Sequence, residues 1–225
     1  ALQFDMLPEN LRTQAAKRLV DNIRAYDNHL TTGFLGTPYI CHALTRFGYV
    51  DVAYDLLLQR SYPSWLYPVT MGATTIWERW DGIKPDGTFQ TPDMNSFNHY
   101  AYGAVGDWMY RKVAGIDIDP ENPGYKVIRI KPYLTDKLGN AKAELETYYG
   151  KVVSAWENAP GQLSLNIEIP VNATAIVYIP ATDAGKIQEG GKKLSTVKDV
   201  ELTGMEDGYV MVKVGSGSYS FTVAK

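Results

Sequence analysis

The spacing of apolar residues divides the chain into two parts with different periodicities. In the first part apolar residues recur at helical spacing, which predicts helices in the ranges 8–26, 37–48, 50–60 and 96–114. Beyond residue 115 apolar and polar residues alternate instead, and turn residues separate the alternating runs. This second pattern predicts strands at 125–132, 141–149, 151–157, 162–169, 174–180, 197–202, 209–214 and 217–223.

Particular residues mark the expected helix ends. Thr37 is expected to be the N-cap of the second helix, with Pro38 at its first position. Ser96 is expected to cap the fourth helix. The segment 81–95 between the helices is long for a loop inside a compact domain, and its length suggests a functional role.

The change of period predicts two domains, a helical one at 1–115 and a β-sandwich of short antiparallel strands at 116–225. The first residues after the change form an Asp- and Pro-rich segment, which we interpret as a solvated linker. Asp117, Asp119 and Glu121 superficially resemble a calcium loop, but the glycine and the closing glutamate of such a loop are missing.

Charge and cysteine content exclude several classes of function. The formal net charge of −3 and a pI near 5.6 do not favour a nucleic-acid partner, and neither a basic run nor an apolar membrane-spanning run is present. Cys41 is the single cysteine, which excludes an internal disulfide or a cysteine-based metal cluster. His29 and His42 have no metal-ligand spacing. The first residue is not Met, and helical patterning follows almost at once, as expected of a segment from a longer protein.

Two dense stretches carry the candidate chemistry. Trp77 and Trp80 flank Glu78, so that flat apolar faces suited to a sugar ring lie beside a carboxyl group suited to acid–base chemistry. The second stretch, at 95–103, contains His99. From the residues alone, ordinary structural roles remain open: Glu78 could pair with Arg79, the tryptophans could be core residues, and His99 could be a structural histidine.

Three motifs together resemble a known family. They are LTTGFLGTP at 30–38, TTIWERWD at 74–81 and SFNHYAYGAV at 96–105. Their order and spacing are similar to the end of the catalytic domain of bacterial α-L-rhamnosidases, glycoside hydrolase family 78, and the resemblance covers almost the whole chain. It implies a partial (α/α)6 barrel followed by an antiparallel β-sandwich. It also implies a rhamnose-containing glycoside or oligosaccharide as the substrate, with no cofactor.

The resemblance further implies inverting hydrolysis of terminal α-L-rhamnosides, with specific roles for four residues. Glu78 matches the general base, His99 matches the histidine that contacts rhamnose, and Trp77 and Trp80 are expected to line the pocket. The family's general acid lies earlier in the barrel, on an acidic motif that this chain does not contain. We therefore expect the isolated chain to be nearly inactive. We also expect its incomplete barrel to expose an apolar face through which copies could associate.

Two other kinds of function remain open. One is another inverting glycosidase, or a glycoside phosphorylase, on the same architecture. A phosphorylase needs a phosphate site near the base, where Arg79 is the only nearby cation. The other is a non-catalytic carbohydrate-binding or structural fragment, which fits the missing acid but gives no reason for the intact Trp–Glu motif. The sequence does not give the aglycone, the oligomeric state or the compartment.

Overall fold

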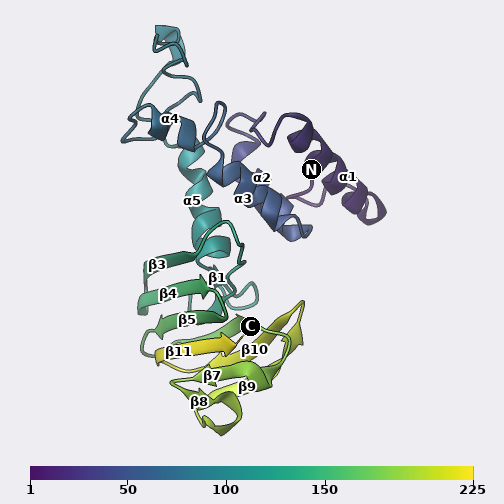
Figure 1. The fold of residues 1–225 in the computed structure, drawn as a ribbon, viewed down its shortest axis with the longest axis vertical. Helices are drawn as coiled ribbons and strands as arrows, with labels where there is room; N and C mark the ends of the chain where they lie inside the picture. The colour runs from purple at the N-terminus through teal and green to yellow at the C-terminus, as the bar shows by residue number, and fades with distance from the viewer. Residues whose placement is uncertain (225) are drawn as a thin grey trace. The chain divides into compact units, whose positions relative to one another are not determined.

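The chain folds into two compact units, Ala1–Trp108 and Met109–Lys225, in a computed structural model that describes residues 1–224. Helices and loops make up the first unit, and strands dominate the second (Figure 1). None of the described helices is both long and apolar enough to span a bilayer. The compact units meet between Trp108 and Met109, a few residues before the domain boundary that the sequence predicts between residues 115 and 116. That boundary remains a prediction.

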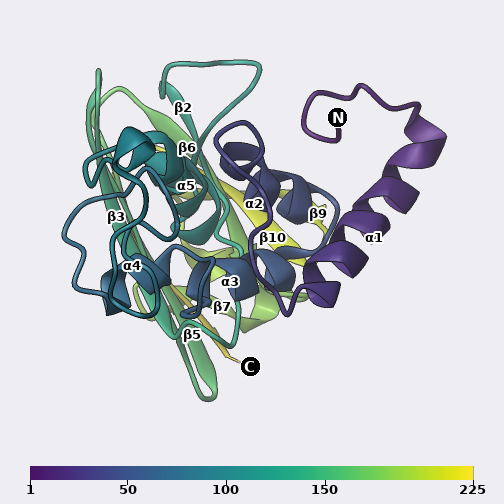
Figure 2. The same ribbon diagram turned by 90° about the horizontal axis from the view of Figure 1, so that it is seen from above.

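The first three predicted helices are present. They are α1 Glu9–Ala25, α2 Thr37–Arg46 and α3 Val50–Leu58, and a short α4 spans Leu66–Thr70. The buried residues of α1, Ala16, Val20 and Ile23, follow the spacing of one helix face. The residues before α1 fold back beside its first turn (Figure 2), where Asp5 pairs with Arg12 and Arg46.

Two expectations about helix starts are wrong. Gly36, not Thr37, is the N-cap of α2, and the Thr37 hydroxyl instead meets that of Thr32 at 2.8 Å. Ser96 caps no helix, because its backbone is paired with an earlier stretch of the chain. The helical segment begins only at Ala101–Ala104, a 3-10 turn, and continues through α5 Val105–Trp108 and a π-helical turn at Met109–Val113.

Trp108 forms the centre of the helical unit's core. Its side chain is 1% exposed and packs edge-on against Tyr54 of α3, with ring centroids 5.2 Å apart. Its indole Nε1 donates a hydrogen bond to Thr45 Oγ1 of α2 at 2.8 Å. A single buried side chain therefore joins α2, α3 and α5, and its one polar group is satisfied.

The second unit contains two sheets. The five-stranded sheet has the order β1 Ile116–Ile118, β2 Val127–Ile130, β6 Thr174–Pro180, β10 Tyr209–Val214 and β9 Val200–Glu206. The six-stranded sheet has the order β3 Asn140–Thr147, β4 Gly150–Ala159, β5 Gln162–Ile169, β11 Gly217–Ala224, β7 Ile187–Glu189 and β8 Lys192–Lys193.

Most predicted strands are confirmed, and the bounds of β5, β6 and β10 match those expected from the sequence. The alternation in β5 buries Leu163, Leu165, Ile167 and Ile169 on one face. The sandwich is not wholly antiparallel, because β2 pairs with β6 in parallel. Three short strands, β1, β7 and β8, were not predicted, since strands of two or three residues are too short for alternation to reveal.

The expected solvated linker is also wrong at Asp117. This residue lies in β1 and is only 5% exposed. Its carboxylate accepts from Arg111 Nε at 2.8 Å and from Lys112 Nζ at 2.9 Å. Burial opposes ionisation of Asp117, but the two cations outweigh burial and lower its pKa. A buried ion pair thus anchors the π-helical turn to the first strand of the sandwich.

Candidate active site

The two chemistry-bearing stretches lie against each other through backbone hydrogen bonds. Glu78 N donates to Ser96 O, and His99 N donates to Ile76 O, each at 2.8 Å. The Thr75 hydroxyl donates to Phe97 O. These bonds explain why Ser96 begins no helix, and they bring Glu78 and His99 into one local structure although about twenty residues separate them in sequence.

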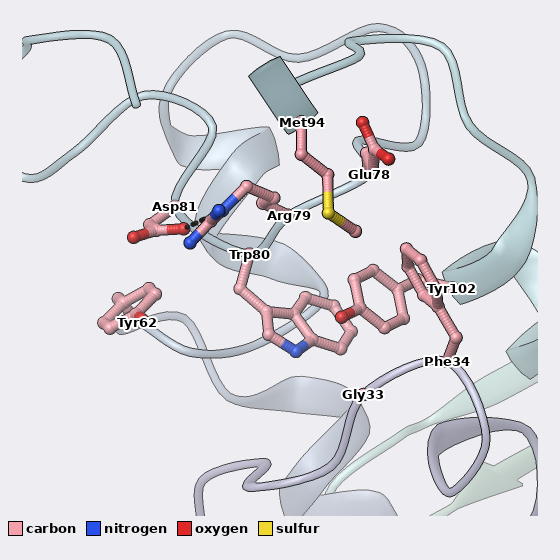
Figure 3. Close-up of a pocket in the computed structure, with 9 residues that line it drawn as sticks. All are labelled: Gly33, Phe34, Tyr62, Glu78, Arg79, Trp80, Asp81, Met94 and Tyr102. Carbon is pink, nitrogen blue, oxygen red and sulfur yellow. Dashed lines mark hydrogen bonds and ion pairs between the residues drawn. The ribbon is translucent and has the colours of Figure 1, made fainter. Parts of the chain in front are cut away.

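Glu78 is held by one of its two carboxylate oxygens. Its Oε2 accepts a hydrogen bond from Ser96 N at 2.8 Å, which fixes the plane of the carboxylate. Within residues 1–224, Oε1 has no hydrogen-bond partner. The side chain is partly exposed and lines a pocket (Figure 3). One anchored and one available oxygen is an arrangement suited to taking a proton from a water molecule.

The pocket encloses about 370 Å3, within the range of roughly 300–1,000 Å3 that is typical of small-molecule sites. Loops, and not helix faces, supply nearly all of its wall. Figure 3 shows the residues that line it: Gly33, Phe34, Tyr62, Glu78, Arg79, Trp80, Asp81, Met94 and Tyr102. In the part of the chain that the structure describes, no three His, Cys, Asp or Glu side chains are placed to hold a metal ion.

Stacked aromatic rings form one wall of the pocket. The indole of Trp80 stacks on Tyr102 with centroids 3.7 Å apart and planes 11° apart. Trp80 Nε1 donates to Thr32 O at 3.3 Å, and Trp65 packs edge-on against the indole at 5.7 Å. These contacts hold the indole in one orientation, so that a ligand meets a rigid aromatic surface.

His99 does not line the pocket itself, but its ring stacks on Phe34, which does. Its ring is stacked between Phe34, at 4.9 Å and 8°, and Tyr100, at 5.4 Å and 10°. Ala101 N donates to His99 Nδ1 at 3.2 Å. Because Nδ1 accepts this hydrogen bond, the proton of the neutral imidazole sits on Nε2, which can donate to a ligand hydroxyl.

Trp77 lies away from the pocket lining. It is 5% exposed and packs edge-on against Phe97, with ring centroids 5.1 Å apart. A Cβ atom at Gly82 would lie 3.1 Å from its ring, so the surrounding loop closes tightly over the indole. Its contact with a sugar remains a prediction, and the pocket described here does not use it.

Several pocket residues were not predicted from the sequence. Arg79 Nε contacts Asp81 Oδ1 at 3.3 Å, and Gln90 Nε2 donates to Asp81 Oδ2 at 2.6 Å. Burial, followed by the charge of Asp81, raises the pKa of Tyr62. Arg79 and Asp81 lie in the same dense stretch as Glu78, and this position in the sequence could have marked them as pocket residues. Tyr62 had no such signal, because it comes from a separate loop.

A helical unit with a carboxylate and a rigid indole in one pocket, followed by a β-sandwich, has the features of a carbohydrate-active enzyme of the glycosidase class. Residues 1–113 match the family described as the bacterial alpha-L-rhamnosidase 6 hairpin glycosidase domain, and residues 115–194 match the bacterial alpha-L-rhamnosidase C-terminal domain. The chain belongs to the bacterial α-L-rhamnosidase family.

Full-length relatives extend well beyond this chain. An alpha-L-rhamnosidase of Streptomyces avermitilis is 46% identical over 99% of the chain, and one of Formosa agariphila is 40% identical over 98%. The chain spans 21% and 24% of the lengths of these two proteins. It therefore corresponds to less than a quarter of either relative.

Solved structures agree with this assignment. The Streptomyces avermitilis alpha-L-rhamnosidase, complexed with L-rhamnose, matches 99% of this chain and 21% of its own with a TM-score of 0.90 at 46% identity. The alpha-L-rhamnosidase from Dictyoglumus thermophilum matches all of this chain and 24% of its own, with a TM-score of 0.84 at 36% identity. These matches confirm the predicted fold, part of a six-hairpin barrel followed by a β-sandwich.

Proposed function

We propose that this chain supplies the general base of an α-L-rhamnosidase that hydrolyses terminal α-L-rhamnosides with inversion at the anomeric carbon. The observation that carries the proposal is the Glu78 carboxylate, anchored by Ser96 N at 2.8 Å, in a pocket walled by Trp80 and Tyr102. Membership of the rhamnosidase family supports a rhamnose-containing substrate. We also propose that residues 1–115 form the helical domain and residues 116–225 the β-sandwich domain.

Glu78 has a defined task in this mechanism. A water oxygen forms a bond to the anomeric carbon while the bond to the leaving oxygen breaks, and the proton of the water passes to Glu78 Oε1. The hydrogen bond from Ser96 N holds Oε2, so the carboxylate does not rotate away from the water. Trp80 offers its ring to the apolar face of the sugar. His99 stacks on the pocket residue Phe34, and in this proposal its Nε2–H reaches a sugar hydroxyl from there.

The general acid belongs, in this proposal, to a part of the parent enzyme outside these residues. This agrees with the small share of the curated relatives that the chain spans. Without a proton donor for the leaving oxygen, the isolated chain should bind rhamnose but turn over a rhamnoside far more slowly than a complete enzyme. Sugar binding without turnover is also the outcome that a purely carbohydrate-binding fragment would give, so a catalytic test needs the complete barrel.

We further propose that isolated copies associate through the apolar face of the helical unit. A groove of about 410 Å3 lies along this face, and the residues that line it include Leu7, Leu19, Leu35, Tyr39 and Ile40. Leu35 is 90% exposed, so association would remove a large apolar side chain from water. Sedimentation velocity should show dimers or larger species that a Leu35→Lys substitution disperses. A monomer at all concentrations would contradict association.

A graft tests the catalytic proposal directly. This chain would replace the matching segment of the Streptomyces avermitilis relative, whose remaining residues supply the rest of the barrel. In the graft, Glu78→Gln should lower kcat on an aryl α-L-rhamnoside by about 10²–10⁴-fold, as expected when a general base is lost. Proton NMR of the unsubstituted graft should show β-L-rhamnose as the first product.

The matched control is Glu9→Gln, at an exposed glutamate in the first turn of α1. It should leave kcat unchanged. A Glu78→Gln graft that keeps more than a tenth of the activity, or α-L-rhamnose as the first product, would contradict the proposed base or the inverting stereochemistry respectively. Circular dichroism of each graft separates loss of chemistry from loss of fold.

A further inference from the structure

The Met94 side chain lies in the space that a sugar ring needs. Met94 lines the pocket, and Figure 3 shows its thioether end directed toward the stacked rings of Trp80 and Tyr102, with Glu78 on one side and Arg79 on the other. A sugar ring that packs on Trp80 within reach of Glu78 must occupy this same space. Met94 in its present position and a bound sugar therefore exclude each other.

Little buried surface holds Met94 in this position. The residue is 48% exposed, and all four residues of the segment 91–94 that carries it are exposed. A segment with few buried contacts opens at a low cost in free energy. A methionine side chain is also unbranched and has three rotatable bonds, so it changes its conformation readily. Both the segment and its side chain are thus suited to leave the pocket.

The segment 91–94 is held at its two ends by one carbonyl group. Gln90 N donates to Gly82 O at 3.0 Å, and Asn95 Nδ2 donates to the same oxygen at 3.1 Å. Gln90 is held a second time, because its Nε2 donates to Asp81 Oδ2 at 2.6 Å. An exposed segment between two fixed ends has the geometry of a hinged loop.

One buried acceptor at this hinge is left without a partner. Asn95 Oδ1 is shielded from solvent and, within residues 1–224, accepts no hydrogen bond. Gly82 permits the close packing, since a Cβ atom there would lie 3.0 Å from Asn95 Oδ1. Burying an acceptor without a partner costs free energy. The present position of the segment carries this cost, and a movement that exposes Asn95 Oδ1 to water would recover it.

We propose that residues 91–94 form a gate over the pocket, hinged at Gln90 and Asn95, with Met94 as its plug. This inference rests on the proposed function. In the closed position Met94 fills the place of the sugar, and in the open position it withdraws and rhamnose enters. The sugar selects the open position, because only that position has room for it. The apparent affinity for the sugar is then the intrinsic affinity multiplied by the open fraction.

Calorimetric titration of the chain with methyl α-L-rhamnoside tests the gate through the sign of one change. If about a tenth of the molecules are open, Met94→Ala should tighten binding about tenfold, because no plug remains. Met94→Leu keeps an apolar side chain of similar volume and should bring the affinity back to within about threefold of the unsubstituted chain. The matched control is Met109→Ala, at a methionine that is 43% exposed and lies outside the pocket, and it should leave the affinity unchanged.

Two outcomes of this titration would overturn the gate. Weaker binding by Met94→Ala would show that Met94 is a fixed wall that contacts the sugar. Unchanged binding by Met94→Ala would show that Met94 does not occupy the place of the sugar.

Methyl NMR measures the gate without a ligand. In the chain labelled with 13C at its methionine methyl groups, relaxation dispersion should show exchange at Met94 on the microsecond-to-millisecond timescale of loop opening, and none at Met109. The spectrum of Met94→Ala identifies the Met94 signal. The open fraction obtained from the dispersion should equal the inverse of the gain in affinity. A Met94 signal without exchange in the free chain would overturn the gate.

Failure of the proposed function has a different signature. Methyl α-L-rhamnoside would then bind neither the unsubstituted chain nor Met94→Ala, or would bind equally well to a Trp80→Ala variant. The methyl exchange decides the gate in that case, since it needs no sugar: exchange at Met94 supports two positions, and its absence overturns them. Binding that depends on Trp80 but is not improved by Met94→Ala leaves the proposed function standing and removes only the gate.

Discussion

The two units of this chain cover their apolar residues to different extents. In the part of the chain that the structure describes, twelve exposed large apolar residues lie in Ala1–Trp108 and six in Met109–Lys225, although the units are similar in length. The sandwich buries its apolar residues by alternation along paired strands. The helical unit leaves residues such as Leu35 and Tyr100 about 90% exposed. The sandwich thus has the features of a self-sufficient domain, whereas the helical unit carries the chemistry and leaves apolar surface uncovered.

The largest expected effect comes from removing the central tryptophan of each unit. Trp156 is 2% exposed, and its Nε1 donates to Val113 O at 2.7 Å, whereas Trp108 occupies the equivalent central place among the helices. Each Trp→Ala change should lower the free energy of unfolding of its own unit by about 3–5 kcal/mol. Because the helical unit exposes more large apolar side chains, we expect it to be the less stable unit, and Trp108→Ala should leave it largely unfolded. Trp156→Ala should leave the sandwich folded.

Cys41 provides a readout for the helical unit alone. Its thiol is 2% exposed, and burial raises its pKa to about 12, so a disulfide reagent reaches it only when the unit opens. Trp108→Ala should speed labelling of Cys41 by at least a hundredfold, and Trp156→Ala by less than tenfold. The opposite order of the two rates would contradict the assignment of lower stability to the helical unit.

A smaller effect is expected at the ion pair that joins Asp117 of β1 to Arg111 and Lys112 of the π-helical turn. Asp117→Asn should destabilise the sandwich by about 1–3 kcal/mol, since the ion pairs of Asp117 with Arg111 and Lys112 are lost while both cations keep access to water. The pKa of Asp117 lies below its ordinary value of 3.8 in the folded state. Its stabilising contribution is therefore complete above that pH and is lost as the pH falls through the lowered pKa.

Urea unfolding followed from pH 7 to pH 2 checks this sign. The difference in stability between the wild-type chain and Asp117→Asn should be constant above about pH 4 and shrink below it. Asp119→Asn, at a neighbouring aspartate that is more exposed, serves as the control. A difference that grows as the pH falls would show that Asp117 is not held ionised by its two neighbours.

The fold was more predictable from the sequence in the sandwich than in the helical unit. Strands such as β5 can be recognised in the sequence by the alternation of apolar and polar residues. Pairing with neighbouring strands keeps this alternation in register, because a one-residue slip would expose the buried face. Ser96 shows the limit. A serine before an apolar run predicts an N-cap, but here its backbone pairs with Glu78, about twenty residues earlier, and local pattern carries no information on such a partner. Asp117 was missed for a different reason: its cations stand only five and six residues earlier, but the strand that buries it, β1, has three residues and shows no alternation.

The candidate site was predictable in its motifs but not in its geometry. Glu78 and Trp80 line the pocket, whereas Trp77 is buried beside Phe97, and the roles expected of all three residues toward a sugar remain predictions. The two tryptophans are three residues apart, and in a regular helix they would share a face. The backbone between them is irregular, so spacing alone does not tell which indole meets a ligand. Tyr62 could not be predicted, because only folding brings its loop to the pocket.

The remaining effects, no larger than that of Asp117→Asn, come from two buried hydroxyl groups, one in each unit. Thr45 Oγ1 accepts from Trp108 Nε1 at 2.8 Å, and Ser154 Oγ donates to Ala114 O at 2.6 Å. Thr45→Val keeps the side-chain shape but leaves a buried N–H without a partner, and should cost about 1–3 kcal/mol. Ser154→Ala leaves only a carbonyl oxygen, which tolerates the loss better, and should cost about 1 kcal/mol.

Cys41 labelling for Thr45→Val and hydrogen exchange along β5 for Ser154→Ala measure the two costs separately. Thr45 Oγ1 also donates to Cys41 O at 2.8 Å, so Thr45→Ser, which keeps both bonds, is the control for the labelling rate. If Ser154→Ala proves the more costly change, the sandwich depends on this single hydroxyl more than its buried apolar faces suggest. If Thr45→Val is the more costly change, a lost polar contact costs more in the unit whose core is less completely covered.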